Sequence, residues 1–287
     1  MSAPAPVLLD EALIAEVRRI AREAGDAILQ IYRAHERGES VGLQHKQDQS
    51  PLTAADLAAH RLISAGLAAL TPEWPVLSEE SAEVPLAVRQ RWSRFWLVDP
   101  LDGTLNFLHG IPHFAVSIAL EREGKLRAGV IFDPMRNETF WAEDGEGAWL
   151  DNKRLRVSAR RKLNDAVVTT GIPQLGVNGG ELFLDELARV RQEVAAVRRF
   201  GSAALDLAWV AAGRFDGFWE RRLSPWDIAA GFLLVQEAGG VVTGLNKSVP
   251  MKGDFVAANT SLAPKLAEVI EGKLRKPAAT HPKLRPV

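Results

Sequence analysis

Apolar side chains recur every three or four residues in two stretches near the start of the chain. The first stretch runs from about Asp10 to Arg33, and the second runs from about Thr53 to Leu70. This spacing places the apolar side chains on one face of a helix, so it predicts two amphipathic helices. The polar segment between them, residues 35–51, contains glycine and serine and predicts a loop.

Short apolar runs replace the helical pattern in the middle of the chain. They predict a buried strand followed by two hairpins, at residues 95–98, 114–134 and 148–158. Beyond them, predicted strands and helices alternate. The strands are expected near residues 167–172, 197–200, 215–220 and 241–244, and the helices near 181–194, 202–212 and 225–238. The mixture predicts an α/β protein whose sheets have antiparallel character.

The change of pattern near residue 158 suggests how the chain is organised. Its 287 residues are enough for one large or two small domains. We divide it into an N-terminal α+β half, residues 1–157, and a C-terminal α/β half, residues 158–272. The remaining residues, 273–287, are basic and contain proline, and we expect a disordered tail.

Composition excludes several classes of function. Lys and Arg number 35 against 36 Asp and Glu, so the chain lacks the basic excess of a dedicated nucleic-acid binder. Cysteine is absent, which excludes disulfides, thiol nucleophiles and cysteine-ligated metals. The first residues do not form a signal peptide, and no apolar run approaches the ~20 residues of a membrane-spanning helix. We therefore expect a cytoplasmic protein without a membrane segment.

The strongest chemical signal is WLVDPLDGTLNF, residues 96–107. A predicted strand delivers Asp99, and Asp102 follows three residues later. Two carboxylates this close can share a hard cation, and the Leu101 carbonyl supplies a third oxygen. Ligands that are all oxygen suit Mg²⁺. The haloacid-dehalogenase phosphatases space their acids as D-x-D, so the D-x-x-D spacing here disfavours an aspartyl nucleophile.

Four further stretches place polar groups where a helix begins or an apolar run ends. Each has a structural explanation: capping of a helix, interaction of an acid with the helix dipole, or, for Glu79 and Glu80, a solvated charge pair. Each also fits a site, because acids, a hydroxyl or the free backbone amides of a helix N-terminus can meet a polar ligand or a metal. Ser202 lacks the G-x-S-x-G context of a nucleophilic serine. The stretches are Thr53 with Asp56, Glu79 with Glu80, Gly201–Ala203, and Trp226 with Asp227.

Taken together, these stretches resemble the inositol monophosphatase superfamily of Mg²⁺-dependent, Li⁺-sensitive phosphatases. The family pattern is T-x-x-D, E-E, D-P-[LI]-D-G-T-x-N-F, G-[ST]-A, a Glu and W-D. The chain carries all of these in this order over roughly residues 10–270. The resemblance implies a layered αβαβα sandwich of the inositol monophosphatase and fructose-1,6-bisphosphatase type. It also implies a homodimer that hydrolyses a small phosphomonoester with metal-activated water.

The resemblance assigns a role to each matching residue. The ligands of two or three Mg²⁺ would be Glu79, Asp99, the Leu101 carbonyl, Asp102 and Asp227. The catalytic groups would be Glu79 and Thr104, with Thr53 and Asp56 orienting the attacking water. Gly103 and Thr104 would hold the phosphate, and the substrate hydroxyls would contact Asp102, Ala203, Glu220 and Asp227. Lys46 lies where the family often has a lysine near the site.

Two parts of the chain resemble different branches of this superfamily. Residues 43–98 resemble 3′(2′),5′-bisphosphate nucleotidases, whereas residues from about 99 onward resemble bacterial inositol-1-monophosphatases. The nucleotidases carry Lys-Glu after D-G-T, where this chain has Leu105-Asn106. The mixture indicates either a divergent natural sequence or a recombinant chimera joined near Asp99.

We expect inositol monophosphate as the substrate. A bisphosphate nucleotide is the first alternative, and another small phosphomonoester such as histidinol phosphate is possible. A role of a different class also stays open, because some bacterial relatives bind the transcription machinery and RNA. The balanced charge gives that role little support, so nucleic acid is not the partner we expect.

Overall fold

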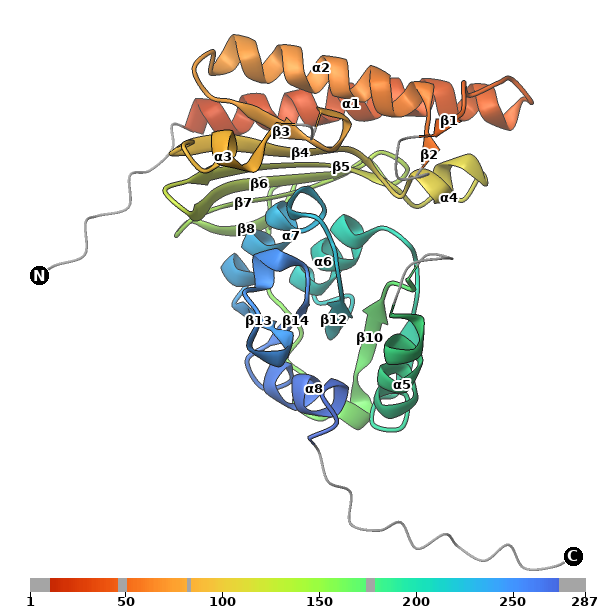
Figure 1. The fold of residues 1–287 in the computed structure, drawn as a ribbon, viewed down its shortest axis with the longest axis vertical. Coiled ribbons are helices and arrows are strands. Elements are labelled where there is room, and N and C mark those ends of the chain that lie inside the picture. The colour runs from red at the N-terminus through yellow and green to blue at the C-terminus, as the bar shows by residue number, and fades with distance from the viewer. Residues whose placement is uncertain (1–10, 46–50, 82–83, 174–178, 274–287) are drawn as a thin grey trace, which may run out of the picture.

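The computed structural model describes residues 11–45, 51–81, 84–173 and 179–273. In these ranges helices and sheets alternate in five layers, in the order helix, sheet, helix, sheet, helix (Figure 1). This is the αβαβα sandwich that the resemblance implied. Lys46 and the basic tail beyond Lys273 lie outside the described residues.

The two periodic stretches near the N-terminus form the helices of the first layer, as their spacing predicts. Ile28 of the first helix and Ile63 of the second are fully buried. Both belong to one apolar cluster with Trp96 of the neighbouring sheet, so the apolar helix faces cover that sheet. The two helices are α1 (Glu11–Glu36) and α2 (Ala54–Leu70).

The segment between these helices contains a pair of strands that the sequence does not predict. β1 (Gln44–His45) pairs antiparallel with β2 (Pro51–Leu52). The expectation of a loop over residues 35–51 is therefore wrong at these strands. Two residues are too short to show the alternation of apolar and polar positions that identifies a strand.

The first sheet has seven strands in the order β3-β4-β5-β6-β7-β8-β9. Only β3 and β4 are parallel neighbours among these strands, and the other pairs are antiparallel. The two predicted hairpins are present as β5-β6 and β8-β9, whereas β7 is not predicted. The strands are β3 (Val76–Ser78), β4 (Arg94–Asp102), β5 (Ala115–Arg122), β6 (Lys125–Asp133), β7 (Glu138–Glu143), β8 (Gly147–Leu150) and β9 (Lys153–Arg154).

Helices α6 (Ala203–Ala211) and α7 (Pro225–Glu237) form the middle layer. Both are largely buried and apolar on all sides, as expected of helices packed between two sheets. Gly129 of β6 lets α7 approach closely, because a Cβ there would lie 2.9 Å from the Ala230 Cα. One apolar cluster joins the first sheet, these helices and the second sheet. The apolar core is therefore continuous across residue 158. The division of the chain there into two halves stays a prediction.

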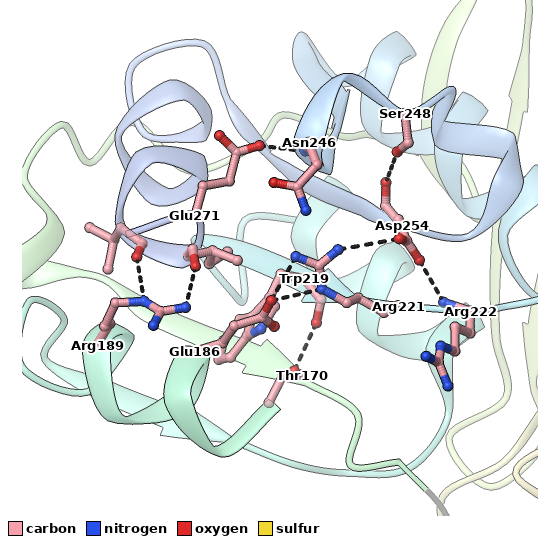
Figure 2. Close-up of polar contacts among 12 residues, drawn as sticks. Thr170, Glu186, Arg189, Trp219, Arg221, Arg222, Asn246, Ser248, Asp254 and Glu271 are labelled. Carbon is pink, nitrogen blue, oxygen red and sulfur yellow. Dashed lines mark hydrogen bonds and ion pairs between the residues drawn. The ribbon is translucent and has the colours of Figure 1, made fainter. Parts of the chain in front are cut away.

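The second sheet has five strands in the order β11-β10-β12-β14-β13. Helices α5 and α8 cover its outer face, where the Arg189 guanidinium of α5 donates to the carbonyls of Val269 and Ile270 at the end of α8 (Figure 2). Neither β14 nor α8 is predicted from the sequence. The elements are β10 (Val167–Thr170), α5 (Gly180–Val190), β11 (Ala196–Arg198), β12 (Gly217–Glu220), β13 (Gly240–Gly244), β14 (Phe255–Asn259) and α8 (Ala263–Ile270).

Short helical turns complete the described chain. None of the helices in the described ranges combines the length and apolar character needed to cross a bilayer. The short turns are η1 (Glu79–Ser81), α3 (Leu86–Arg89), α4 (Thr104–Leu108), η2 (Leu163–Asp165), η3 (Leu245–Lys247) and η4 (Pro250–Lys252).

His113 lies between aromatic rings where the first sheet meets the middle layer. The centroid of its ring is 5.1 Å from that of Phe200 and 5.3 Å from that of Trp209. Neither ring nitrogen has a hydrogen-bond partner within the described part of the chain. Burial, aided by the Arg136 charge, lowers the pKa of His113 from its ordinary 6.5 to about 4. The folded protein therefore holds this imidazole neutral.

This histidine predicts a pH-dependent contribution to stability. Between pH 6.5 and 4 the unfolded chain binds a proton at His113 that the folded chain does not. Acidification through this range should therefore cost about 3 kcal/mol of unfolding free energy, with no further loss from this group below pH 4. Urea unfolding of the wild type and of His113→Phe across this range measures the contribution as a difference. The same pH dependence of the unfolding free energy in the two proteins would rule out a contribution from His113.

Candidate active site

A β-bulge in β4 turns both acids of the D-x-x-D sequence toward one side. Asp99 is paired with Ser117 of β5, and Asp102 is paired with Ala115. An advance of three residues along β4 therefore corresponds to an advance of only two along β5. In a regular strand, residues three apart point to opposite faces. The extra residue of the bulge removes this difference. The two carboxylates thus converge as the sequence predicts, through a bulge rather than through a turn.

Four carboxylates from three elements gather around this bulge. Glu79 begins η1 directly after β3, Asp99 and Asp102 lie on β4, and Asp227 lies in the first turn of α7. Burial raises the pKa of Asp99, and the charges of the other three raise it further. The pKa of Asp227 is also raised well above its usual value, by burial and then by Asp102 and Glu79. The four groups therefore interact electrostatically as one cluster.

Burial also raises the pKa of Asp102, to about 6, although hydrogen bonds to its carboxylate oppose the shift. As whole residues, Asp102 and Asp227 keep some exposed surface, whereas Asp99 is only 2% exposed. The carboxylate groups of all three are enclosed, and this burial is the main cause of their raised pKa values.

The donor chemistry of the cluster fits a hard divalent cation. All its side-chain donors are carboxylate oxygens, and the Leu101 carbonyl lies between two of them in sequence. No three acids or histidines in the described ranges already surround a point in ligand geometry. The carboxylates are neighbours that repel one another, and a cation would reduce that repulsion.

A second group of polar residues adjoins the cluster through Thr104. The Asp56 carboxylate accepts hydrogen bonds from the Thr53 amide at 2.8 Å, the Thr53 hydroxyl at 2.5 Å and the Thr104 hydroxyl at 3.1 Å. The Thr104 Oγ1 also lies 3.0 Å from the Leu101 carbonyl oxygen. The capping box that begins α2 is thus linked to the sequence around Leu101. The capping interpretation of Thr53 and Asp56 is confirmed, and their role in a site stays a prediction.

The N-terminus of α6 binds Asp102. The Ser202 hydroxyl donates to Asp102 Oδ2 at 2.5 Å, and the Ala204 amide donates to the same oxygen at 2.7 Å. The Ala203 amide also bonds this carboxylate. The free amides expected at Gly201–Ala203 therefore meet a side chain of the first sheet. Ser202 is an anchor of that side chain, consistent with its lack of a nucleophile context.

The loop after β4 is fixed to the second half of the chain by Asn106. Gly103 has φ +96° and precedes α4, a left-handed conformation that favours glycine. The Asn106 amide nitrogen donates to the carbonyls of His113 and Phe200, each at 2.8 Å. These bonds join the phosphate-binding segment that the resemblance implies to the loop before α6.

Glu220 ends β12 close to Asp206 of α6. Burial raises the pKa of Glu220 to about 8, and the charges of Asp206 and Asp102 add to the shift. Asp206 is 2% exposed, and its Oδ1 has no hydrogen-bond partner among the described residues. None of the sequence motifs contains Asp206. An acid inside a helix that is apolar on all sides is the signal that could have identified it.

The model of the inositol monophosphatase family matches residues 10–275. The chain belongs to this family. The match extends across Asp99 without interruption, so the suggestion of a chimera is not confirmed.

Members of the family are similar over most of the chain. An inositol-1-monophosphatase from Caulobacter vibrioides is 49% identical over 76% of this chain and 86% of its own length. A protein named Nus factor SuhB from Pseudomonas aeruginosa is 42% identical over 89% of this chain and 94% of its own. The crystal structure of extragenic suppressor protein suhB from Bartonella henselae has a TM-score of 0.85. It is 42% identical and covers 92% of this chain and 100% of that one.

Mutual repulsion in the cluster predicts that an acid there opposes stability until a cation binds. Without Mg²⁺, Asp99→Asn should raise the free energy of unfolding by roughly 1–3 kcal/mol, because the buried acid must either stay ionised or take up a proton and the amide does neither. With millimolar Mg²⁺ the wild type should gain stability by preferential binding to the folded state, and the variant should gain little. Urea unfolding in EDTA and in Mg²⁺ measures both effects.

Asp133→Asn is the matched control for this experiment. Asp133 is also fully buried, but it is bound to the Arg136 side chain at 2.9 Å and lies outside the cluster. Its variant should lose stability in EDTA and keep the wild-type response to Mg²⁺. An equal Mg²⁺ response in Asp99→Asn and in the wild type would refute the metal assignment.

Proposed function

We propose that this protein is a Mg²⁺-dependent phosphomonoesterase that hydrolyses inositol monophosphate with a water molecule as the nucleophile. The observation that carries the proposal is the cluster of Glu79, Asp99, Asp102 and Asp227 beside the hydrogen-bonded pair Thr104 and Asp56. Membership of the inositol monophosphatase family supports it, as do the names of relatives about half identical to this chain.

The metal would be held by the four carboxylates and by the Leu101 carbonyl, which suit two or three Mg²⁺. When bound, Mg²⁺ neutralises phosphate charge, stabilises the leaving oxygen and lowers the pKa of a coordinated water. The bulge of β4 and the N-termini of α6 and α7 hold the ligand side chains in place. Ser224, for example, donates its amide to Asp227 Oδ2 at 2.8 Å.

Thr104 and Asp56 would orient the attacking water. With its proton donated to Asp56, the Thr104 hydroxyl presents lone pairs that accept a hydrogen bond from water. The Thr53 amide and hydroxyl fix the Asp56 carboxylate from the other side. Glu79, in the family role, would assist in activating that water. Water positioned in this way needs no covalent enzyme intermediate.

Substrate recognition would come from the loop after β4 and from the second half of the chain. Gly103 and Thr104 would hold the phosphate. The hydroxyls of the substrate would contact Asp102, the Ala203 backbone, Glu220 and Asp227. Leu105, half exposed where the nucleotidase branch has lysine, favours an inositol ester over a bisphosphate nucleotide.

Phosphate release from two esters tests the proposal. With Mg²⁺, inositol-1-phosphate should show a higher kcat/KM than 3′-phosphoadenosine-5′-phosphate. Asp99→Asn should lower the rate at least about a hundredfold because a metal ligand is lost, while Asp133→Asn keeps it. A preference for the nucleotide would make the substrate assignment wrong. Failure of the folded wild type to hydrolyse either ester would make the phosphatase assignment wrong.

A binding role in transcription is a second candidate, favoured by relatives named Nus factor SuhB that are 42% identical to this chain. Deletion of the basic tail, residues 273–287, separates the two roles. If the tail contributes to binding, affinity for RNA should fall while turnover stays intact. The homodimer, the cytoplasmic location and the sensitivity to Li⁺ are further proposals that rest on the family.

A further inference from the structure

The carboxylate of Glu220 lies directly against the backbone of Gly171. A Cβ built on Gly171 would lie 1.9 Å from Glu220 Oε1, 2.1 Å from Cδ and 2.3 Å from Oε2. All three distances are far below van der Waals contact, so a side chain at this position and the present carboxylate exclude each other. The Gly171 amide also donates a hydrogen bond to the carboxylate.

The backbone itself does not require glycine here. The φ angle of Gly171 lies outside the left-handed region, in contrast to thirteen other glycines of the described chain. Alanine could therefore adopt the same backbone conformation without strain. The methyl group of alanine would, however, occupy the space of the carboxylate. Glycine at position 171 therefore makes room for the Glu220 side chain.

The backbone on both sides of this contact is firmly held (Figure 2). Strands β10 and β12 run parallel with Thr170 paired to Trp219, and the Thr170 hydroxyl donates to the Trp219 carbonyl at 2.8 Å. This pairing places Gly171 beside Glu220. Relaxation of a clash by sliding one strand past the other would break these bonds.

The residue after Glu220 is anchored as well. Arg221 donates to Glu186 of α5 at 2.7 Å and to Asp254 at 3.2 Å, as Figure 2 shows. Glu186 is 1% exposed, so the ion pair lies inside the protein. With the backbone fixed on both sides, the position of the Glu220 carboxylate depends on the space beside it.

We propose that Gly171 is a positioning residue that sets the place of the Glu220 carboxylate and thereby the preference for phosphomonoesters with ring hydroxyls. The inference rests on the proposed function, in which Glu220 contacts a substrate hydroxyl. An added methyl group moves the flexible end of Glu220 and leaves the fold intact, because a carboxylate can rotate away. The displaced group then loses its bond to the hydroxyl, and Gly171 itself touches no substrate.

Selectivity is the readout that a purely structural role would leave unchanged. In Gly171→Ala the ratio of kcat/KM for inositol-1-phosphate to that for p-nitrophenyl phosphate, which has no ring hydroxyl, should fall at least about tenfold. Gly180→Ala is the matched control, because a Cβ there meets nothing within 4 Å and φ is again not left-handed. Its selectivity should equal that of the wild type.

The same substitution in a Glu220→Ala background tests whether the effect passes through Glu220. Selectivity is already low in Glu220→Ala, and adding Gly171→Ala should not lower it further. Urea unfolding gives an independent test of the contact. Gly171→Ala should lower the midpoint in the wild-type background and should not lower it when Glu220 is alanine.

Each outcome decides the inference. Unchanged selectivity in folded Gly171→Ala overturns it, and so does an equal loss in the Glu220→Ala background. If Gly171→Ala does not fold but the double variant does, the contact is supported. If neither folds, Gly171 serves another purpose and the inference is wrong. A wild type that cleaves neither ester overturns the proposed function and the selectivity claim together, whereas the unfolding cycle still tests the contact alone.

Discussion

Repulsion among the carboxylates of Glu79, Asp99, Asp102 and Asp227 is the constraint to which the surrounding structure responds. Enclosed carboxylates are costly unless they accept hydrogen bonds or meet an opposite charge. The fold supplies the hydrogen bonds from backbone amides. The Leu101 amide donates to Asp99 at 3.0 Å, and the helix N-termini donate to Asp102 and Asp227. The pKa values of Asp99 and Asp227 are nevertheless raised, so these bonds compensate only in part. The cation that we propose would supply the rest.

The cluster depends on several layers at once. Asp99 and Asp102 lie on β4 of the first sheet, and Glu79 begins η1 directly after β3. Asp227 and the donors to Asp102 come from the middle helices. Because α6 and α7 are packed between the two sheets, the site forms only when these layers are assembled. Asn106 adds a direct bond between the loop after β4 and the loop before α6. Close packing of Gly129 against Ala230 brings α7 directly onto the first sheet.

The sequence predicts the fold class and the gathering of four acids, whereas the roles assigned to the site residues stay predictions. Short motifs name the residues at the centre, and helix periodicity identifies α1 and α2 because their apolar faces repeat over many residues. β14 and α8 escape prediction, since five buried residues in a row and an eight-residue helix carry too little periodicity. The bulge between Asp99 and Asp102 is a matter of register with β5, which no local pattern contains. The contact of Gly171 with Glu220 joins residues 49 positions apart and becomes visible only in three dimensions.

Direct measurement of metal binding tests the central claim that these carboxylates form a divalent-cation site. Electron paramagnetic resonance of Mn²⁺ added to metal-free protein reports bound and free ion without any need for turnover. We predict that the wild type binds Mn²⁺, that Mg²⁺ displaces it, and that Asp99→Asn weakens binding at least about tenfold. Equal binding of Mn²⁺ by the wild type and by Asp99→Asn would contradict the account.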